Sequence, residues 1–393
     1  MQGLSTKNIY HAKRLGKTSQ VGGRLKRVKI ARKTSLRVNS KGLPMPSLQF
    51  ILGSAAVDHQ AALLDHLAAQ LAAHPTDRFF YLVPNHIKFS TEIDVLSQLK
   101  ARQASPIYAQ TQVQVLSFSR LAWFLLRDVP AFNAPRISPT GLTMVVAAIV
   151  KQLTPAQLRL FAKEAHQPGF IQDLTKQVME LRNANIAPED YDQIKQRSAA
   201  WAQAHGQTDA AFDDKLAVLF TVYQRFMAAL GDQLATPDIY DLLIQALRQG
   251  DFSTTHFYLD RYNAQFSAKE EQVVEAMIEN GATTTVSLVL DRPYRGSQVP
   301  DPNQLFYQPG LMYHRLARFA EQHGAITFLP DEFASRPRVA PALQEVERWL
   351  AATSQFTTPA PAPTLPPAVH FMTAPTRLAE LNAVAAKIRQ LVT

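Results

Sequence analysis

The sequence lacks cysteine entirely across its 393 residues. Disulfides, thiolate metal sites, iron–sulfur ligation by cysteine and cysteine nucleophiles are therefore excluded within these residues. The sequence also lacks any run of about 18 or more apolar residues, so it predicts no membrane span. An apolar secretory segment is missing from the N-terminus as well. Together these absences favour an intracellular protein.

Acidic side chains are missing from the first 44 residues, which hold twelve lysines and arginines. The whole sequence has 41 basic and 32 acidic side chains, which leaves 29 basic and 32 acidic ones, a net charge of −3, after residue 44. The formal net charge of +9 thus comes from this basic tail. The overall basicity is no argument that the folded body binds nucleic acid.

Three interpretations of the basic tail (residues 1–44) stay open. It is typical of a disordered arm that binds nucleic acid, and its acid-free composition also fits an organellar transit peptide. The third interpretation is upstream sequence translated ahead of a natural start at Met45, where the composition changes abruptly. Under each of them we expect the tail to be disordered and to lie outside the fold.

Short apolar runs with strand character recur along the body, and the first leads into a helical pattern. The predicted strands are Leu48–Leu52, Phe79–Val83, Val113–Phe118, His256–Leu259, Thr284–Leu290, Ile326–Leu329 and Val369–Met372. Strands that alternate with helices predict an α/β fold, in which helices cover both faces of a parallel sheet.

A long helical stretch separates the third predicted strand from the fourth. Three hydroxyl–proline pairs predict helix starts, because the hydroxyl caps the helix and proline suits its first position. The pairs are Ser138-Pro139, Thr154-Pro155 and Thr236-Pro237. An apolar stripe follows at helical spacing, and we interpret it as packing. It comprises Leu216, Leu219, Phe220, Tyr223 and Phe226–Met227.

These patterns predict a helical subdomain inserted into an α/β domain. The α/β domain would comprise residues 45–135 and 251–352, and the insertion residues 136–250. Residues 353–368 are proline-rich and predict a linker. Residues 369–393 would open a second α/β domain, with one strand and a helix from about Leu378 to Leu391, and this domain looks cut off.

The first predicted strand ends at Gly53, where a phosphate-binding loop would follow. Such a loop needs a second glycine, a lysine and a hydroxyl residue at fixed spacing. This sequence has Asp58, His59 and Gln60 at those positions. Gly53 and Ser54 would remain as cofactor-binding positions of a degenerate loop. The pattern favours an ordinary strand-to-helix turn over a working nucleotide site.

The segment from Phe257 to Asp260 is similar to the strand-end aspartate that helps to hold magnesium in phosphate-loop enzymes. Its neighbour is Arg261, where a hydrolytic motor usually has an acidic residue. The histidines show no metal-ligand spacing, and no Ser–His–Asp group can be assembled. We therefore identify no catalytic residue and predict no metal site.

The segment Ser117–Trp123 places two aromatic residues and an arginine at the end of a predicted strand. Ligand crevices of α/β folds lie at such strand ends. Phe118 and Trp123 could stack on bases, and Arg120 could contact phosphate. In the alternative interpretation, the two aromatic residues belong to the core and Arg120 lies on a solvated helix face.

Taken in order, several segments resemble the N-terminal part of the AddB/RexB subunit of bacterial two-subunit helicase–nucleases, especially the RexB type. The matching segments are Phe50–Ala56, Tyr81–Asn85, Val115–Trp123, Leu259–Tyr262 with Phe266 and Glu270, and Ala374–Arg377 with Glu380. Each motif is weak alone, but their order and spacing make the resemblance specific.

The resemblance implies a superfamily-1-like helicase fold, in which a RecA-like domain carries the helical insertion. It implies a cytoplasmic bacterial protein that processes DNA ends for recombinational repair, as a heterodimer with the A-type chain of the helicase–nuclease. In this family the motor of the B-type chain follows single-stranded DNA and helps to recognise a hot-spot sequence. The magnesium-dependent nuclease domain, which holds an iron–sulfur cluster in some members, falls outside this sequence. No cofactor is expected in these residues.

The resemblance implies that Phe118, Arg120 and Trp123 contact the single-stranded DNA. It implies the same role more weakly for Tyr262. His86 and Lys88 would occupy a loop that faces the DNA. Two further hypotheses stay open: an ATP-hydrolysing motor with an atypical phosphate loop, and a truncated product without independent activity.

Overall fold

The computed structural model describes residues 45–102, 110–165, 167–205, 210–262, 266–353 and 372–392. Its centre is a seven-stranded sheet in the order β3-β2-β4-β5-β1-β6, with β7 also paired to β1. All named strand pairs are parallel. The strands are β1 (Ser47–Gly53), β2 (Arg78–Leu82), β3 (Val113–Leu116), β4 (Phe252–Leu259), β5 (Gly281–Val289), β6 (Thr327–Phe328) and β7 (Glu332–Phe333). The predicted α/β fold with a parallel sheet is confirmed.

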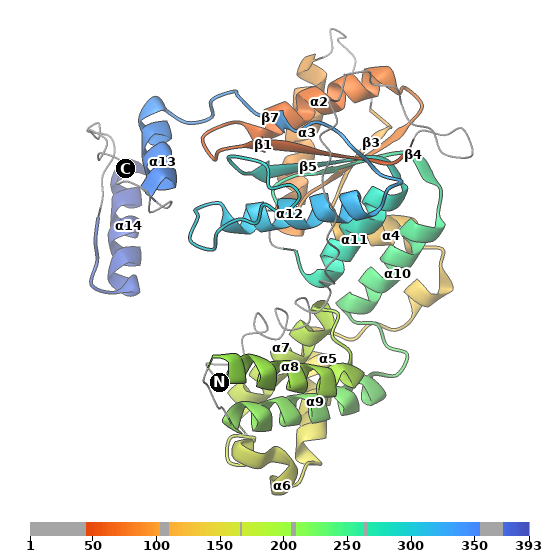
Figure 1. Cartoon of the computed structure of the whole chain (residues 1–393), viewed down its shortest axis with the longest axis vertical. Helices are drawn as coiled ribbons and strands as arrows, with labels where there is room; N and C mark the ends of the chain where they lie inside the picture. The colour runs from red at the N-terminus through yellow and green to blue at the C-terminus, as the bar shows by residue number, and fades with distance from the viewer. Residues whose placement is uncertain are drawn as a thin grey trace, which may run out of the picture.

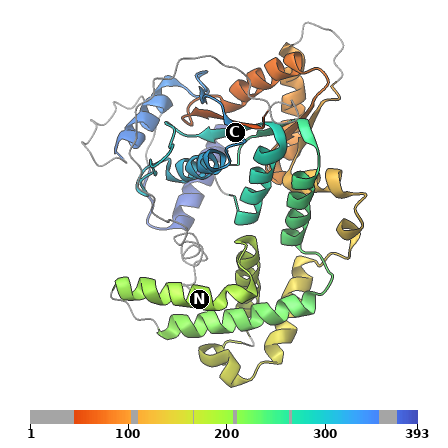
Figure 2. The same cartoon turned by 45° about the vertical axis from the view of Figure 1, so that its right-hand side comes forward.

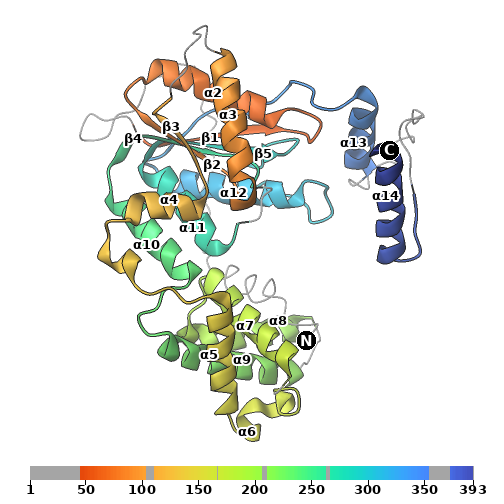
Figure 3. The same cartoon turned by 180° about the vertical axis from the view of Figure 1, so that it is seen from behind.

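Helices cover both faces of the sheet (Figures 1 and 3). One face carries α2 (His59–Ala73) and α3 (Lys88–Arg102), and the other carries α4 (Phe118–Leu126), α10 (Thr236–Gln249), α11 (Ala268–Asn280) and α12 (Tyr307–Gln322). Successive side chains of a strand point to opposite faces. In β2, Phe79 and Tyr81 join the core under α2 and α3, whereas Phe80 and Leu82 join the opposite core. Burial on both faces explains why these strands read as continuous apolar runs.

The insertion forms a separate helical body with its own core (Figure 2). Its helices are α5 (Pro139–Lys151), α6 (Pro155–Leu158), α7 (Pro168–Asn183), α8 (Tyr191–Ala204) and α9 (Ala210–Leu230). Ser138 and Thr154 cap α5 and α6 through their hydroxyls, as predicted. The predicted stripe on α9 is buried from Leu216 to Phe226.

The helix α10 lies within residues 136–250 but packs with the sheet domain. Leu243, Ile244 and Leu247 of α10 belong to the core beneath the sheet, whereas the core of the insertion ends at Ala235. Thr236 is the first residue of this helix rather than its cap, because Ala235 is at the N-cap position. The Asp238 side chain accepts a hydrogen bond from the amide of Ala235.

Chain entry into the insertion lies beside chain exit. Ile137 N donates to Leu234 O at 3.1 Å, and Leu234 N donates to Pro135 O at 2.8 Å. These bonds form a parallel bridge between Arg136 and Leu234. The two segments that connect the insertion to the sheet domain therefore lie side by side.

Three sequence predictions differ from the structure or lie outside it. The third strand ends at Leu116, and Phe118 already begins α4 because Ser117 caps that helix. The basic tail lies outside the described residues, as do residues 354–371, which include most of the linker and of the strand Val369–Met372. Met372 is described and is not part of a strand.

Two helices follow the sheet, α13 (Pro341–Thr353) and α14 (Arg377–Val392). The helix predicted from Leu378 to Leu391 is confirmed as α14, none of whose residues is buried. None of the helices in the described ranges is both long enough and apolar enough to cross a membrane.

Candidate functional site

The loop after β1 presents its amides at the carboxyl edge of the sheet, and a glutamate from α13 binds them. Ala55 N donates to Glu347 Oε1 at 2.5 Å, and Ala56 N donates to Glu347 Oε2 at 3.1 Å. Backbone amides after such a strand are the groups that cradle phosphate in nucleotide-binding loops. In this structure a carboxylate of the same chain occupies these two amides.

Side chains also fill the inside of this loop. A Cβ added at Gly53 would lie 2.6 Å from Val57 Cγ2, 3.2 Å from His59 Cε1 and 3.3 Å from Ala334 Cβ. His59 Nε2 lies 2.9 Å from Ser54 O, and its Nδ1 lies 3.3 Å from Ser287 Oγ. The imidazole thus closes the loop from within.

The other two departures from a phosphate-binding pattern have structural roles. Asp58 is the N-cap of α2 and accepts a hydrogen bond from Ala61 N at 2.9 Å. Gln60 Oε1 accepts from Arg261 Nη2 at 2.6 Å. Capping by aspartate is common and stabilises a helix start. The sequence in this loop therefore builds a strand-to-helix turn.

Asp260, at the end of β4, is 2% exposed and is held by protein groups. Tyr81 Oη donates to its Oδ2 at 2.8 Å, and Arg261 Nε lies 3.5 Å from the same oxygen. Burial raises the pKa of Asp260, against the opposing effects of the Tyr81 hydrogen bond and the Arg261 charge. Arg261 has a φ of 60°. The hydrogen-bond and ion-pair partners of Asp260 in this structure are therefore Tyr81 and Arg261.

Two of the residues predicted to contact DNA, Phe118 and Tyr262, pack against each other. Phe118 is 3% exposed, and its ring stacks on Tyr262 at 4.8 Å between centroids and 16° between planes. Phe266 completes the cluster, 5.8 Å from Phe118 and 5.0 Å from Tyr262. Burial raises the pKa of Tyr262. In this packing the two rings face each other, and their contact with DNA stays a prediction.

Trp123 is the aromatic residue of this segment that faces solvent, with 48% of its surface exposed. The Arg127 guanidinium lies 5.9 Å from its ring centroid, and Arg120 is exposed one turn earlier on α4. Residues three and four apart share one face of a helix. Arg120, Trp123 and Arg127 therefore form one exposed row, which we name the α4 strip.

The loop after β2 lies next to the start of α4. Ser117 Oγ donates to Asn85 Oδ1 at 3.1 Å and accepts from Arg120 N at 3.4 Å. His86 is exposed in this loop, and Lys88 forms an ion pair with Glu92 at 2.6 Å. The structure thus brings His86 and Lys88 to the same sheet edge as the α4 strip.

Sequence reasoning missed an exposed apolar pair next to Lys88. Phe89 is 74% exposed and Ile93 is 53% exposed on α3, whose buried face consists of Thr91, Val95 and Leu99. The i, i+4 spacing of Phe89 and Ile93 away from this face is the signal that could have revealed them. Arg127 was missed because it lies just after the matched segment.

A family model described as the N-terminal region of AddB matches residues 50–347. Relatives named as the B chain of an ATP-dependent helicase/deoxyribonuclease are 46% identical over 362 residues in Limosilactobacillus fermentum, 42% over 366 in Limosilactobacillus reuteri and 40% over 351 in Lactiplantibacillus plantarum. Each alignment covers 88% of this chain, which spans less than a third of the length of these relatives. The chain therefore belongs to the AddB family, and its matched residues represent the N-terminal region of that family.

Proposed function

We propose that this chain is the nucleotide-independent, DNA-contacting N-terminal part of a helicase–nuclease subunit. It binds single-stranded DNA while the ends of double-strand breaks are processed for recombinational repair. The observation that carries the proposal is the α4 strip, a half-exposed tryptophan with an arginine one turn to either side.

Base stacking on an exposed aromatic ring tolerates any sequence, because every base has a π-face. Arginines beside that ring can contact phosphates on both sides of the stacked base. Trp123 offers the ring, and Arg120 and Arg127 offer the two cations. His86 lies on the neighbouring loop, and Lys88 follows it as the first residue of α3, where it is paired with Glu92. A strand that crosses the carboxyl ends of β2 and β3 would meet all five side chains.

The loop after β1 supports the proposed nucleotide independence. Glu347 accepts hydrogen bonds from the amides of Ala55 and Ala56, and the lysine position of a phosphate loop holds His59. A phosphate would have to displace a carboxylate and would find no lysine to neutralise it. Gly53 and Ser54 are therefore proposed as structural positions.

The relatives are each named as one chain of a helicase/deoxyribonuclease. We extend this to a heterodimer with the A-type chain of the helicase–nuclease, to hot-spot recognition and to work in the bacterial cytoplasm. Magnesium-dependent strand cleavage would be carried out by residues outside this chain.

Affinity for a fluorescently labelled oligothymidine strand, measured by anisotropy, tests the proposal. One aromatic stack is worth about 1–3 kcal/mol, so Trp123→Ala should weaken binding roughly five- to 150-fold. Trp201→Ala is the matched control, since Trp201 is 51% exposed on α8 of the insertion. An equal loss in both variants, or no loss in Trp123→Ala, would contradict the proposal.

The salt dependence of binding tests the arginine separately. Arg120→Ala should reduce the slope of log affinity against log salt by about 0.7, because one phosphate contact to single-stranded DNA is lost. Arg318→Ala, an exposed arginine on α12, should leave the slope unchanged. The twelve charges of the basic tail attract DNA without specificity, so the series is repeated on a chain that starts at Met45.

A further inference from the structure

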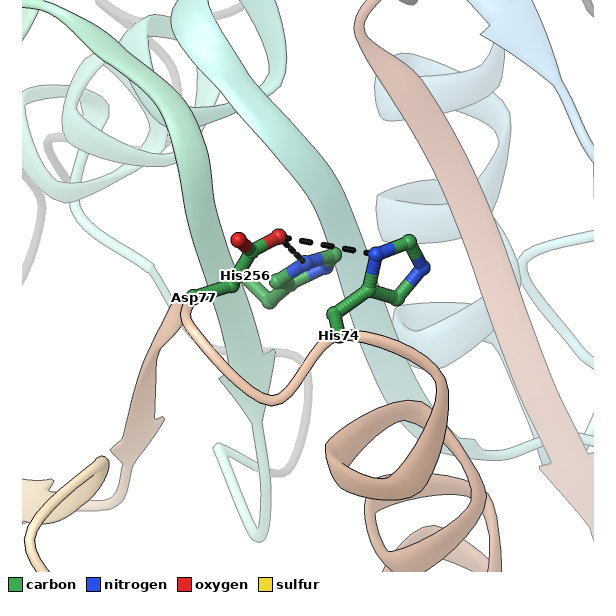
Figure 4. A group of neighbouring side chains, drawn as sticks. All are labelled: His74, Asp77 and His256. Atoms are coloured by element: carbon green, nitrogen blue, oxygen red, sulfur yellow. Dashed lines mark hydrogen bonds and ion pairs between the residues drawn. The ribbon is translucent and has the colours of Figure 1, made fainter.

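Two histidines and an aspartate meet at the amino edge of the sheet, on the opposite edge from the α4 strip (Figure 4). His74 is the residue at the C-terminal cap of α2, Asp77 directly precedes β2, and His256 lies within β4. Asp77 Oδ2 lies 3.1 Å from His256 Nε2 and 3.6 Å from His74 Nδ1. The three nearest ligand atoms all lie within 4.8 Å of one another.

The turn that carries Asp77 is held in place by other polar groups. Gln112 Nε2 donates to Pro75 O at 2.6 Å and to Asp77 O at 3.2 Å. Thr76 Oγ1 donates to Asp77 Oδ1 at 3.4 Å. One carboxylate oxygen is thus occupied, and the other is directed at the two imidazoles, as Figure 4 shows.

His256 is an unusual choice for the interior of a central strand. It is 2% exposed, and its ring stacks on Phe79 at 4.7 Å and 9°. Its Nδ1 has no hydrogen-bond partner among the described residues. Its Nε2, 3.1 Å from Asp77 Oδ2, is the ring nitrogen that an ion bound to this carboxylate would meet.

We propose that His74 Nδ1, Asp77 Oδ2 and His256 Nε2 bind one divalent transition-metal ion, zinc in the first place. Imidazole and carboxylate together suit zinc and its neighbours, whereas magnesium and calcium prefer sets of oxygen ligands. Three protein ligands leave the fourth tetrahedral position for water, and the His74 side chain, 46% exposed, opens the site to solvent.

Only a small movement of the His74 side chain is needed to bring the three ligand atoms to metal-binding distances, and this side chain is half-exposed. Zinc–nitrogen and zinc–oxygen bonds of about 2.0–2.1 Å place tetrahedral ligands about 3.3 Å apart. The Asp77–His256 and Asp77–His74 distances are already close to this value. Rotation of the half-exposed His74 at the helix end brings its nitrogen toward His256. The bound ion would link the C-terminal end of α2 to β4 and so stabilise the packing of α2 on the sheet.

The site lies at the amino edge of the sheet, on the opposite edge from the α4 strip, so this proposal is independent of the function proposed above. The two nearest ligands along the chain, His74 and Asp77, lie three residues apart, whereas His256 lies 179 residues beyond Asp77. A metal clip across such a long loop restricts the unfolded chain. We therefore expect bound zinc to raise the midpoint of thermal unfolding.

The test uses the full chain without an affinity tag, freed of metal by a chelator. Titration with Co²⁺ should give the visible bands of tetrahedral cobalt that saturate at one equivalent, and Zn²⁺ should displace the cobalt. His74→Ala should weaken zinc binding at least tenfold, measured by calorimetry, and should abolish the zinc-dependent rise in unfolding midpoint. Asp77→Asn should weaken zinc binding in the same direction.

His323→Ala is the matched control, because His323 is also 46% exposed and lies 3.8 Å from a carboxylate oxygen of Glu279. Its zinc affinity should equal that of the unchanged chain. The metal-free unfolding midpoint of His74→Ala should match that of the unchanged chain, which separates ligand loss from misfolding. Absence of saturable one-equivalent binding, or equal affinity in His74→Ala and His323→Ala, would overturn the proposal.

Discussion

Glu347 occupies two amides of the loop after β1, since its two carboxylate oxygens accept hydrogen bonds from Ala55 N and Ala56 N. We predict that neither the unchanged chain nor Glu347→Ala binds Mg–ATP saturably at micromolar concentration, because His59 stands where the phosphate loop needs lysine. Titration with a fluorescent ATP analogue measures this. Saturable binding by the unchanged chain would show a working nucleotide site. Binding gained in Glu347→Ala would instead make Glu347 a competitor for nucleotide.

The same variant should loosen α13. Two hydrogen bonds to a charged, partly exposed group contribute about 1–3 kcal/mol together. Hydrogen–deuterium exchange of α13 and of the amides of Ala55 and Ala56 should therefore increase in Glu347→Ala. Glu345→Ala, which changes an exposed residue of the same helix, should leave this exchange unchanged.

Gly53 is required by close packing. A Cβ at this position would lie 2.6 Å from Val57 Cγ2, so Gly53→Ala should destabilise the protein by about 1–3 kcal/mol through overpacking. Gly169→Ala is the matched change, because a Cβ there meets nothing within 4 Å in helix α7. It should leave stability unchanged or raise it by up to about 1 kcal/mol. Urea denaturation of both variants checks the difference, and equal midpoints would refute the packing argument.

Single residues also mark where sequence reasoning stops. The sequence grouped Phe118, Arg120 and Trp123 at the end of a predicted strand, and the structure places all three on α4. It could not separate a buried ring from an exposed one, since both interpretations use aromatic side chains at helical spacing. Burial of Phe118 depends on Tyr262 and Phe266, which lie more than 140 residues away.

At the scale of elements, the first turn of α4 connects the fold to the proposed DNA surface. Ser117 caps α4 and bonds to Asn85 of the neighbouring loop. Ser117→Ala should cost about 1 kcal/mol of stability and should also weaken DNA binding, because the α4 strip loses its anchor. Ser138→Ala removes the equivalent cap from α5 and should cost a similar free energy with DNA affinity unchanged. Urea denaturation and anisotropy on the same samples measure the two effects, and unchanged DNA affinity in Ser117→Ala would disprove the link.

Most elements could be predicted from local signals. Short continuous apolar runs located the strands, and hydroxyl–proline pairs located the starts of α5 and α6. The membership of α10 could not be predicted. Its apolar face would suit either core, and only the three-dimensional position of Leu243 and Leu247 beneath the sheet decides it.

At the scale of the whole molecule, the sheet domain and the insertion have separate cores. We predict two unfolding transitions in scanning calorimetry. Leu216→Ala, in the insertion, should lower one of them, and Leu316→Ala, on α12, should lower the other. Both leucines are 0% exposed, and such changes cost about 2–5 kcal/mol. A single transition that both variants lower equally would show that the two cores unfold as one.

Long-range contacts set the limit of what sequence could predict about the sites. Glu347 reaches a loop about 290 residues earlier in the chain, and no local pattern connects the two. His256 lies 179 residues from Asp77, far outside the short spacings by which metal sites are identified in sequences. Pairing of strands across the sheet creates both contacts.

The strand order has a consequence for synthesis on the ribosome. β1 pairs with β5, β6 and β7, and about 228 residues separate the end of β1 from the start of β5. At roughly 5–20 residues per second, β1 waits about 11–46 s for its first partner. During that time its seven apolar-rich residues, all buried in the final fold, have two open edges, which invite pairing with other chains. The insertion is synthesised in this interval and has its own core, so it can fold before β5 is synthesised. Meanwhile α2 and α3 can cover one face of β1.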